Sequence, residues 1–151
     1  MKYKICVMKN AFYAQSGGVT SVINSSAYGV LSQIKKSAPE SKTFASKNGI
    51  VGLLENELYD MQKTKKPLEL LLESPAGMFG SCRYKLPDLE DEGFYKNLFT
   101  QLEKYEIKYF FYNGGNDSAD TCLKVSQAAK NFSYDLNAIA VPKTIDNDLA
   151  V

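Results

Sequence analysis

The chain has 151 residues, of which 44% are hydrophobic and 23% are charged, so it can bury the core of one ordinary domain. Its formal net charge is only +1 and its charges are interspersed, which argues against a surface that binds nucleic acid. The three cysteines lack metal-ligand spacing, the N-terminal apolar run is too short for a signal peptide, and no stretch is long enough to cross a membrane. We therefore expect a reduced, cytoplasmic setting.

The first predicted unit is a strand, a glycine turn and an amphipathic helix. Residues 11–15 (AFYAQ) form an apolar run typical of a buried strand, and apolar residues recur near helical spacing over residues 22–34. Between them, the SGG turn at residues 16–18 lets backbone amides approach an anion, and Thr20 or Ser21 can cap the helix. Taken alone, this turn is equally consistent with a tight bend that binds nothing.

The middle of the chain is expected to carry a second strand and several loops. Residues 43–46 (TFAS) suit the strand, and residues 48–52 (NGIVG) suit a flexible turn. The residues expected in the core are Leu53, Leu54, Leu58 and Met61. Residues 68–73 form either a short helix or a buried strand, which periodicity alone does not separate.

Arg83 follows a glycine-rich bend, GMFGSC at residues 77–82. An arginine beside such a bend can offer its fork of hydrogen-bond donors to phosphate oxygens. The simpler interpretation is a surface arginine without a ligand. The motif taken alone leaves both interpretations open.

The second half of the chain predicts two further strands and two helices. Apolar residues from Phe94 to Tyr105 step at helical spacing, which indicates a helix with one buried face. Residues 107–112 (IKYFFY) form a strand whose aromatic density suits a central position; a helix starts at Asn116, and residues 137–141 (NAIAV) form the last strand. This alternation predicts an α/β fold: a doubly wound, mostly parallel sheet with helices on both faces.

Two polar loops follow the last two predicted strands, GGNDS at residues 114–118 and PKTIDND at residues 142–148. The loops should meet, because ligands bind at the carboxyl ends of the strands in such sheets. The first loop has glycines and helix-start donors that suit a phosphate, and the second has acids and a lysine that suit phosphoryl transfer. Together they predict a phosphotransferase site, although the second loop taken alone fits an Asx turn equally well.

Phosphoryl transfer needs an anion cradle, a metal, a cation and a base, and the chain offers a candidate for each. Glycines of the two turns, among them Gly18 and Gly115, allow close backbone approach to phosphate. Lys143 supplies positive charge, and Asp146 is the candidate base. The candidate Mg²⁺ ligands, directly or through water, are Asn116, Asp117 and Asp148.

These motifs, in this order, resemble those of the phosphofructokinase family. The resemblance extends from residue 10 onward and rests on the motifs SGG at 16–18, NGIVGL at 48–53, GSCR at 80–83, GGNDS at 114–118 and PKTIDND at 142–148. It implies the transfer of a phosphoryl group to the 1-hydroxyl of fructose 6-phosphate.

The resemblance also implies a role for each candidate residue. Asp146, the base, and Lys143 are the implied catalytic residues. Those implied to bind fructose 6-phosphate are Thr144, Ile145 and Asp146; those implied to bind the diphosphate are Gly18, Arg83, Gly115 and Lys143; those implied to bind Mg²⁺ are Asn116, Asp117 and Asp148. Asn116 departs from the family, which usually has a magnesium-binding aspartate there. Either its amide oxygen serves, or Asp117 takes part of that role.

Two positions distinguish the phosphoryl donor. ATP-dependent members of the family typically have glycine where this chain has Asp117 and Lys143, whereas pyrophosphate-dependent members carry the acid and the lysine. The Asp117 carboxylate would crowd and repel the inner phosphate of a nucleotide, while Lys143 attracts the compact pyrophosphate. The chain thus resembles the pyrophosphate-dependent type. The alternatives are an ATP-dependent 6-phosphofructokinase and an inactive fragment that only binds phosphate.

We expect residues 1–151 to be the N-terminal, phosphoryl-donor-binding part of a longer enzyme, because the chain ends three residues after Asp148. The resemblance places the contacts to the sugar 6-phosphate beyond residue 151, often in a neighbouring subunit. It implies a homo-oligomer that acts reversibly on pyrophosphate and fructose 6-phosphate in glycolysis. No nucleic-acid partner and no membrane partner is expected.

Overall fold

The computed structural model describes residues 9–20 and 22–143. Its strands are β1 (Asn10–Gln15), β2 (Thr43–Ser46), β3 (Leu58–Asp60), β4 (Ile107–Gly114) and β5 (Asn137–Pro142). Its helices are α1 (Ile23–Ser37), α2 (Ile50–Leu54), α3 (Leu70–Glu73), α4 (Glu92–Lys104) and α5 (Asn116–Asn131). The predicted strands and helices correspond to β1, α1, β2, α4, β4, α5 and β5. No helix in this described part of the chain is long and apolar enough to cross a membrane.

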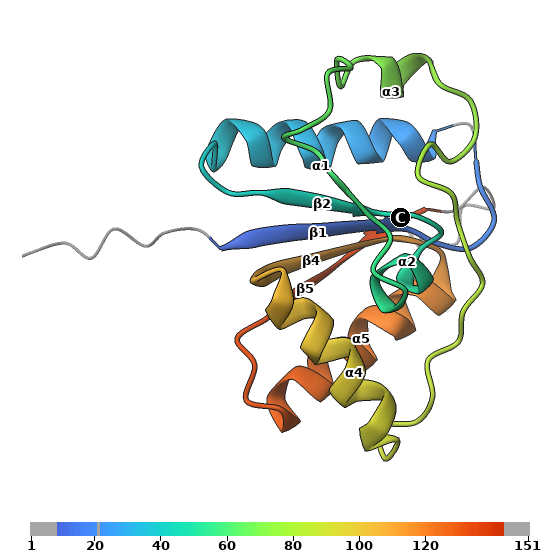
Figure 1. The fold of residues 1–151 in the computed structure, drawn as a ribbon. Coiled ribbons are helices and arrows are strands. Elements are labelled where there is room, and N and C mark those ends of the chain that lie inside the picture. Colours follow the sequence, from blue (N-terminus) through green and yellow to red (C-terminus); the bar gives the residue numbers. More distant parts are fainter. Residues whose placement is uncertain (1–8, 21, 144–151) are drawn as a thin grey trace, which may run out of the picture.

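The five strands form one sheet in the order β3-β2-β1-β4-β5. Neighbouring strands are parallel except for β3, which runs antiparallel to β2. Figure 1 shows α1 and α3 on one face of the sheet, and α2, α4 and α5 on the other. The doubly wound, mostly parallel sheet predicted from the sequence is confirmed.

The path of the chain across the sheet reverses after β3. From β1 the chain moves outward to β2 and β3, and it then returns to β4 on the other side of β1 and continues to β5. From the pair Ala11↔Tyr109, β1 and β4 stay in register up to the pair Gln15↔Asn113, so both strands end at the same edge. The helices that follow them, α1 and α5, cover opposite faces (Figure 1). Their connecting loops therefore diverge at this edge, where α/β sheets bind ligands.

Apolar side chains cover both faces of the sheet. Along β1, Phe12 and Ala14 belong to the cluster packed with α2, α4 and α5, whereas Tyr13 belongs to the cluster packed with α1 and α3. The alternation follows the two-residue period of a strand. Phe12 stacks on Phe110 of β4, with ring centroids 4.8 Å apart. All four side chains are fully buried, so β1 and β4 form a closely packed base for the loops that follow them.

The segment around β3 departs from the prediction. α2 begins at Ile50, inside the predicted turn, after Gly49 adopts a φ of 68°. Of the residues expected in the core, Leu53 is fully buried, whereas Leu54, Leu58 and Met61 are half-buried and pack against the core. Leu58 belongs to β3, a short strand at the edge of the sheet. The ambiguous segment at residues 68–73 contains the helix α3.

The start of α1 also differs from the prediction. Thr20 does not cap the helix: its hydroxyl is buried without a hydrogen-bond partner, and α1 begins at Ile23 after Val22. The Ile23 amide donates instead to the main-chain carbonyl of Thr20 (3.4 Å), so the backbone takes the place of the predicted side-chain cap. Ser21, the other predicted cap, lies outside the described residues.

Candidate active site

A cleft of about 570 Å³ lies at the carboxyl ends of β1, β4 and β5. The loop after β1, the segment around Arg83, the start of α5 and the residue after β5 contribute its walls. Of the predicted site residues, it brings together Gly18, Arg83, Gly115, Asn116, Asp117 and Lys143. Those that lie outside the described residues are Thr144, Ile145, Asp146 and Asp148, whose roles stay predictions.

The glycine turn after β1 is held by backbone hydrogen bonds on two sides. Ser16 N donates to Asn113 O of β4 (2.8 Å), and Gly17 N donates to Cys82 O (3.0 Å). Gly17 has a φ of 76°, a left-handed conformation that glycine adopts without a steric cost. The turn is therefore attached both to the sheet and to the segment that carries Arg83.

Arg83 reaches the turn because the residues before it are tied down. Ser81 Oγ donates to Gly17 O (2.6 Å). The Arg83 side chain is exposed, and its Nη2 lies 3.6 Å from the place where a Cβ on Gly18 would be. The guanidinium thus borders the cleft beside a backbone without a side chain, a position that suits the predicted binding of phosphate.

The N-terminus of α5 forms a second wall of the cleft. Gly115 precedes the helix, and its carbonyl accepts hydrogen bonds from Ser118 N (3.0 Å) and Ala119 N (3.1 Å). Asn116 and Asp117 occupy the first turn, as the sequence predicted. Because α5 is 16 residues long, its N-terminal amides and its dipole favour an anion at this end.

Gly114 allows this wall to approach the glycine turn. A Cβ on Gly114 would overlap Ser118 Oγ and would lie 2.8 Å from Ser16 O, which is closer than Cβ atoms approach other heavy atoms. A side chain here would push the start of α5 away from the loop after β1. The width of the cleft therefore depends on a glycine at this position.

Lys143 closes the cleft from the end of β5. Its backbone amide donates to Gly114 O (2.9 Å), and its ammonium donates to Gly18 O. Arg83 and Lys143 thus flank the same glycine turn, next to the N-terminus of α5. Two cations and a helix N-terminus create a positive potential that suits a compact polyanion. Asp117 and Asp120 line the cleft as well, so a bound ligand meets two carboxylates there.

The described residues offer few ligands to a metal. Within residues 9–20 and 22–143, no group of three or more His, Cys, Asp or Glu side chains could hold a metal ion. Asn116 and Asp117 bring one amide oxygen and one carboxylate to the cleft. Mg²⁺ keeps several waters and is usually bound by one or two carboxylates together with substrate phosphates, so this sparse set fits a Mg²⁺ that binds with a phosphate ligand.

Sequence reasoning missed several buried polar residues behind the cleft. Asn113, fully buried near the end of β4, accepts a hydrogen bond from Tyr13 Oη (2.9 Å) and donates to Val141 O (2.8 Å), so it joins β1, β4 and β5. Burial raises the pKa of Tyr13, which keeps its hydroxyl a neutral donor. Gln15 Nε2 donates to Asn24 Oδ1 (3.0 Å). A polar residue at the end of an apolar strand is the signal that could have identified Asn113 and Gln15.

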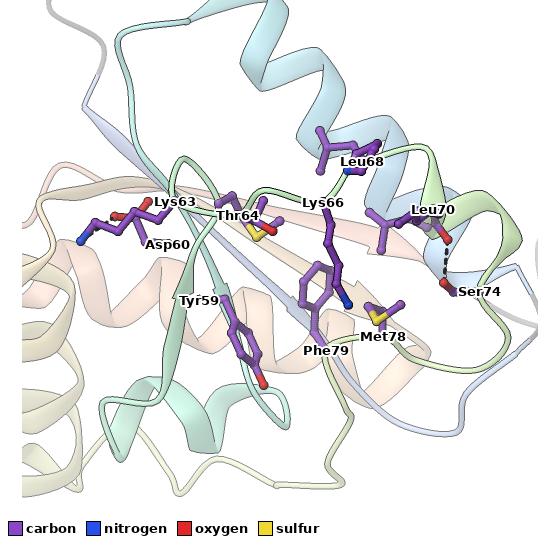
Figure 2. A pocket seen from close by; sticks show the side chains of 13 residues that line it. Tyr59, Asp60, Lys63, Thr64, Lys66, Leu68, Leu70, Ser74, Met78 and Phe79 are labelled. Carbon is purple, nitrogen blue, oxygen red and sulfur yellow. Dashed lines mark hydrogen bonds and ion pairs between the residues drawn. The ribbon is translucent and has the colours of Figure 1, made fainter.

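A larger cavity, of about 630 Å³, lies away from this cleft, between β3, the loop at residues 63–68 and α3 (Figure 2). Its walls are mostly apolar and share no residue with the cleft. Figure 2 labels Lys66, Met78 and Phe79 among the residues that line this cavity. The candidate site is therefore assigned from the glycine turn, Arg83, Lys143 and the helix N-terminus, and not from the volume of the cavity.

Comparison with known proteins shows the family to which the chain belongs. The profile of the family described as Phosphofructokinase matches residues 10–151. The chain is 52% identical over 145 residues to the pyrophosphate–fructose 6-phosphate 1-phosphotransferase of Halomonas elongata, and 54% identical over 144 residues to that of Xanthomonas campestris pv. campestris. Both alignments cover 94% of this chain but only 35% and 34% of the relatives, so the chain spans about a third of their length.

A solved structure of a phosphofructokinase has a similar fold. The pyrophosphate-dependent phosphofructokinase from Nitrosospira multiformis matches with a TM-score of 0.85 and 48% sequence identity. The match covers 94% of this chain and 35% of that protein. The order of motifs, the sheet topology and these relatives agree, and the chain belongs to the phosphofructokinase family.

Proposed function

We propose that the chain is the N-terminal, phosphoryl-donor-binding part of a pyrophosphate-dependent fructose 6-phosphate 1-phosphotransferase. The reaction transfers a phosphoryl group from pyrophosphate to the 1-hydroxyl of fructose 6-phosphate and leaves phosphate and fructose 1,6-bisphosphate, a reversible step of glycolysis. The observation that carries the proposal is the placement of Lys143 and Arg83 around the turn at Gly17 and Gly18. The relatives from Halomonas elongata and Xanthomonas campestris, whose names state this donor, support it.

Four residues hold the diphosphate in this proposal. Gly18 and Gly115 let main-chain atoms approach the phosphate oxygens, since neither has a side chain in the cleft. Arg83 offers a planar fork of donors, and Lys143 offers a compact charge with three donors. Because one Lys143 donor serves Gly18 O, two remain for phosphate oxygens.

Asp117 and Lys143 together select the donor. Asp117 lies in the first turn of α5 and lines the same cleft as Lys143. Its carboxylate would lie beside the inner phosphate of a nucleotide, where like charges repel and the space is limited. Pyrophosphate lacks the nucleoside, and its higher charge density is matched by the lysine. Repulsion of ATP and attraction of pyrophosphate therefore act in the same direction.

Mg²⁺ is the proposed cofactor, held by Asn116 and Asp117, with Asp148 as the third candidate. When bound, the ion neutralises negative charge on the phosphate oxygens. Asn116 contributes only a neutral amide oxygen, so Asp117 supplies the carboxylate charge among the described ligands. Asp117 thus serves both the metal and the choice of donor.

Asp146 is the proposed base, and Thr144 and Ile145 are the proposed neighbours of the sugar. The proton of the 1-hydroxyl passes to the Asp146 carboxylate while the hydroxyl oxygen forms a bond to phosphorus. The bond between phosphorus and the departing phosphate breaks. Lys143 stabilises the charge on the transferred group. The backbone of Lys143 is held by Gly114 O, so the segment that carries these residues begins beside the donor cleft.

The parent enzyme is proposed to be a cytoplasmic homo-oligomer. This chain covers about a third of the relatives' length, 35% for the relative from Halomonas elongata. We place the contacts to the sugar 6-phosphate in the remaining part or in a neighbouring subunit. The described cleft accordingly contains the proposed donor residues and none assigned to the 6-phosphate.

Titration calorimetry in excess Mg²⁺ tests this proposal by comparing pyrophosphate with ATP. We expect saturable binding of pyrophosphate and weaker binding of ATP. Lys143→Met should reduce the affinity for pyrophosphate by about tenfold or more, because a charge-assisted hydrogen bond is lost. Lys130→Met, at an exposed position in the last turn of α5, is the matched control and should have no effect. Preference for ATP would overturn the assigned donor, and no binding of either ligand would count against a donor site formed by this chain.

A further inference from the structure

Gln15 and Asn24 form a buried pair of amides behind the glycine turn. Gln15 ends β1 and is 0% exposed, and Asn24 lies in the first turn of α1 and is 1% exposed. Gln15 Nε2 donates to Asn24 Oδ1 (3.0 Å). Neither residue lines the cleft, so neither is placed to touch a ligand there. Their role therefore depends on the groups to which they hydrogen-bond.

The pair binds the main chain of a distant loop. Asn24 Nδ2 donates to Ser74 O (2.9 Å), and Asn24 Oδ1 also accepts from Met78 N (2.9 Å). Gln15 Oε1 accepts from Phe79 N (3.3 Å). Three main-chain groups of one loop are therefore satisfied by two side chains that belong to β1 and α1.

The same loop continues into the cleft. Ser81 Oγ donates to Gly17 O (2.6 Å), and Cys82 O accepts from Gly17 N (3.0 Å). Arg83 follows directly, with its Nη2 beside Gly18. Consecutive residues thus connect the amide pair to the guanidinium, and hydrogen bonds attach both ends of this connection to β1 and its turn.

We propose that Gln15 and Asn24 are positioning residues that hold the loop carrying Arg83 against the glycine turn. The functional part of this inference rests on the proposed binding of pyrophosphate in the cleft. An amide suits position 24 because it must donate to a carbonyl and accept from an N–H group at the same time. A carboxylate lacks the donor, and a side chain that is only 1% exposed has little contact with solvent that could replace it. The pair acts on the ligand only through Arg83 and the turn.

Asn24→Asp tests the inference, because it removes the Nδ2 donor with little change in shape. The rate at which iodoacetamide alkylates Cys82, followed by mass spectrometry of its peptide, should rise by about tenfold as the loop opens more often. The affinity for pyrophosphate in excess Mg²⁺ should fall by a similar factor. Asn97→Asp, the same change at an exposed position of α4, is the control and should alter neither quantity.

Gln15→Met is the second variant, because it keeps the side-chain volume without introducing a buried charge. It should produce the same two changes, and it decides the question if circular dichroism shows that Asn24→Asp does not fold. An unchanged rate of Cys82 alkylation would overturn the proposed hold on the loop. Faster alkylation with unchanged pyrophosphate affinity would overturn the positioning role. If the unsubstituted chain binds no pyrophosphate, the proposed function is contradicted. The rate of Cys82 alkylation still shows in that case whether Gln15 and Asn24 hold the loop.

Discussion

Gly114 ends β4 beside the loop that follows β1. The direction in which its side chain would point is occupied by Ser118 Oγ and Ser16 O. Sequence reasoning assigned the glycines of this motif to phosphate binding, because glycine lets a backbone approach an anion. The structure adds a packing requirement that would hold even without a ligand. A measurement of the free energy of unfolding in the absence of ligand separates this packing requirement from ligand binding.

Gly114→Ala is expected to lower the free energy of unfolding by about 1–3 kcal/mol, because the added methyl group overpacks the junction. Urea denaturation without any ligand measures this. Gly29→Ala is the matched control: Gly29 lies on the exposed face of α1, and a Cβ there meets nothing within 4 Å. That change should raise the free energy of unfolding by about 0.5–1 kcal/mol, since alanine is the better helix former. Equal losses of stability in the two variants would contradict the packing argument.

Asp117 and Lys143 make a second prediction about single residues. The double variant Asp117→Gly with Lys143→Gly should raise the ratio of ATP affinity to pyrophosphate affinity by about tenfold or more, because it removes a repulsive carboxylate and an attractive ammonium together. Calorimetric titration of each ligand in excess Mg²⁺ measures the ratio. Lys143→Gly alone should lower the affinity for pyrophosphate without raising the affinity for ATP. If the double variant bound nucleotide no better, the steric and electrostatic account of Asp117 would be wrong.

β5 is an apolar strand at the edge of the sheet in the described part of the chain. Its central residues are Ala138, Ile139, Ala140 and Val141, and Ile139 is 37% exposed. Parallel strands of this composition are usually buried on both faces. An edge without charged side chains also presents a template for pairing with another chain. These features make β5 prone to association.

We expect this chain to self-associate through β5 as its concentration rises. Ile139→Lys should reduce the association, because a charge on the strand opposes pairing with another edge. Sedimentation velocity over a range of concentrations measures the effect. Tyr59→Lys, an exposed residue of the opposite edge strand β3, is the control and should leave association unchanged. If both substitutions reduced self-association equally, β5 would have no special role in it.

The elements also show how far the sequence could predict the structure. β1, α1, β4 and α5 were predictable because their apolar periodicity is local. The rule for strand carboxyl ends correctly placed Lys143, the first residue after β5, beside the start of α5; the rest of that loop lies outside the described residues. β3 was not predictable, because three half-exposed residues become a strand only by pairing with β2. The roles of Gln15 and Asn24 were hidden for a similar reason. The loop groups that they bind lie 50 to 64 residues away along the chain.

At the scale of the whole molecule, the titratable groups determine how stability responds to pH. The chain contains ten tyrosines and no histidine. Burial raises the pKa of Tyr112 and of Tyr134 to about 12, and burial also raises the pKa of Tyr13. Each of these tyrosines is protonated in the folded protein at a pH at which the unfolded chain has begun to ionise. The native state is therefore more sensitive to alkali than to small changes near neutrality.

The free energy of unfolding is expected to be nearly constant from about pH 6 to about pH 8, since no histidine titrates there. Stabilisation from a raised tyrosine pKa is complete below the unfolded value of about 10 and is lost as the pH rises towards the folded value, about 12 for Tyr112. Tyr112→Phe should therefore reduce the alkaline slope by up to about 1.4 kcal/mol per pH unit. Urea denaturation at a series of pH values measures this slope. Tyr59→Phe, at an exposed position, is the control, and equal slopes for the two variants would refute the argument.

The hydrogen bond from the Lys143 ammonium to Gly18 O has a consequence for the thermodynamics of ligand binding. A free lysine side chain carries about 2 kcal/mol of rotamer entropy, which a ligand normally has to overcome when it immobilises the chain. Here the folded protein has already restricted that freedom, and the ammonium keeps two donors for an incoming anion. The restriction depends on the orientation of one peptide group. A rotation of the peptide between Gly18 and Val19 would turn the carbonyl away, release the lysine and weaken anion binding without altering any charged residue.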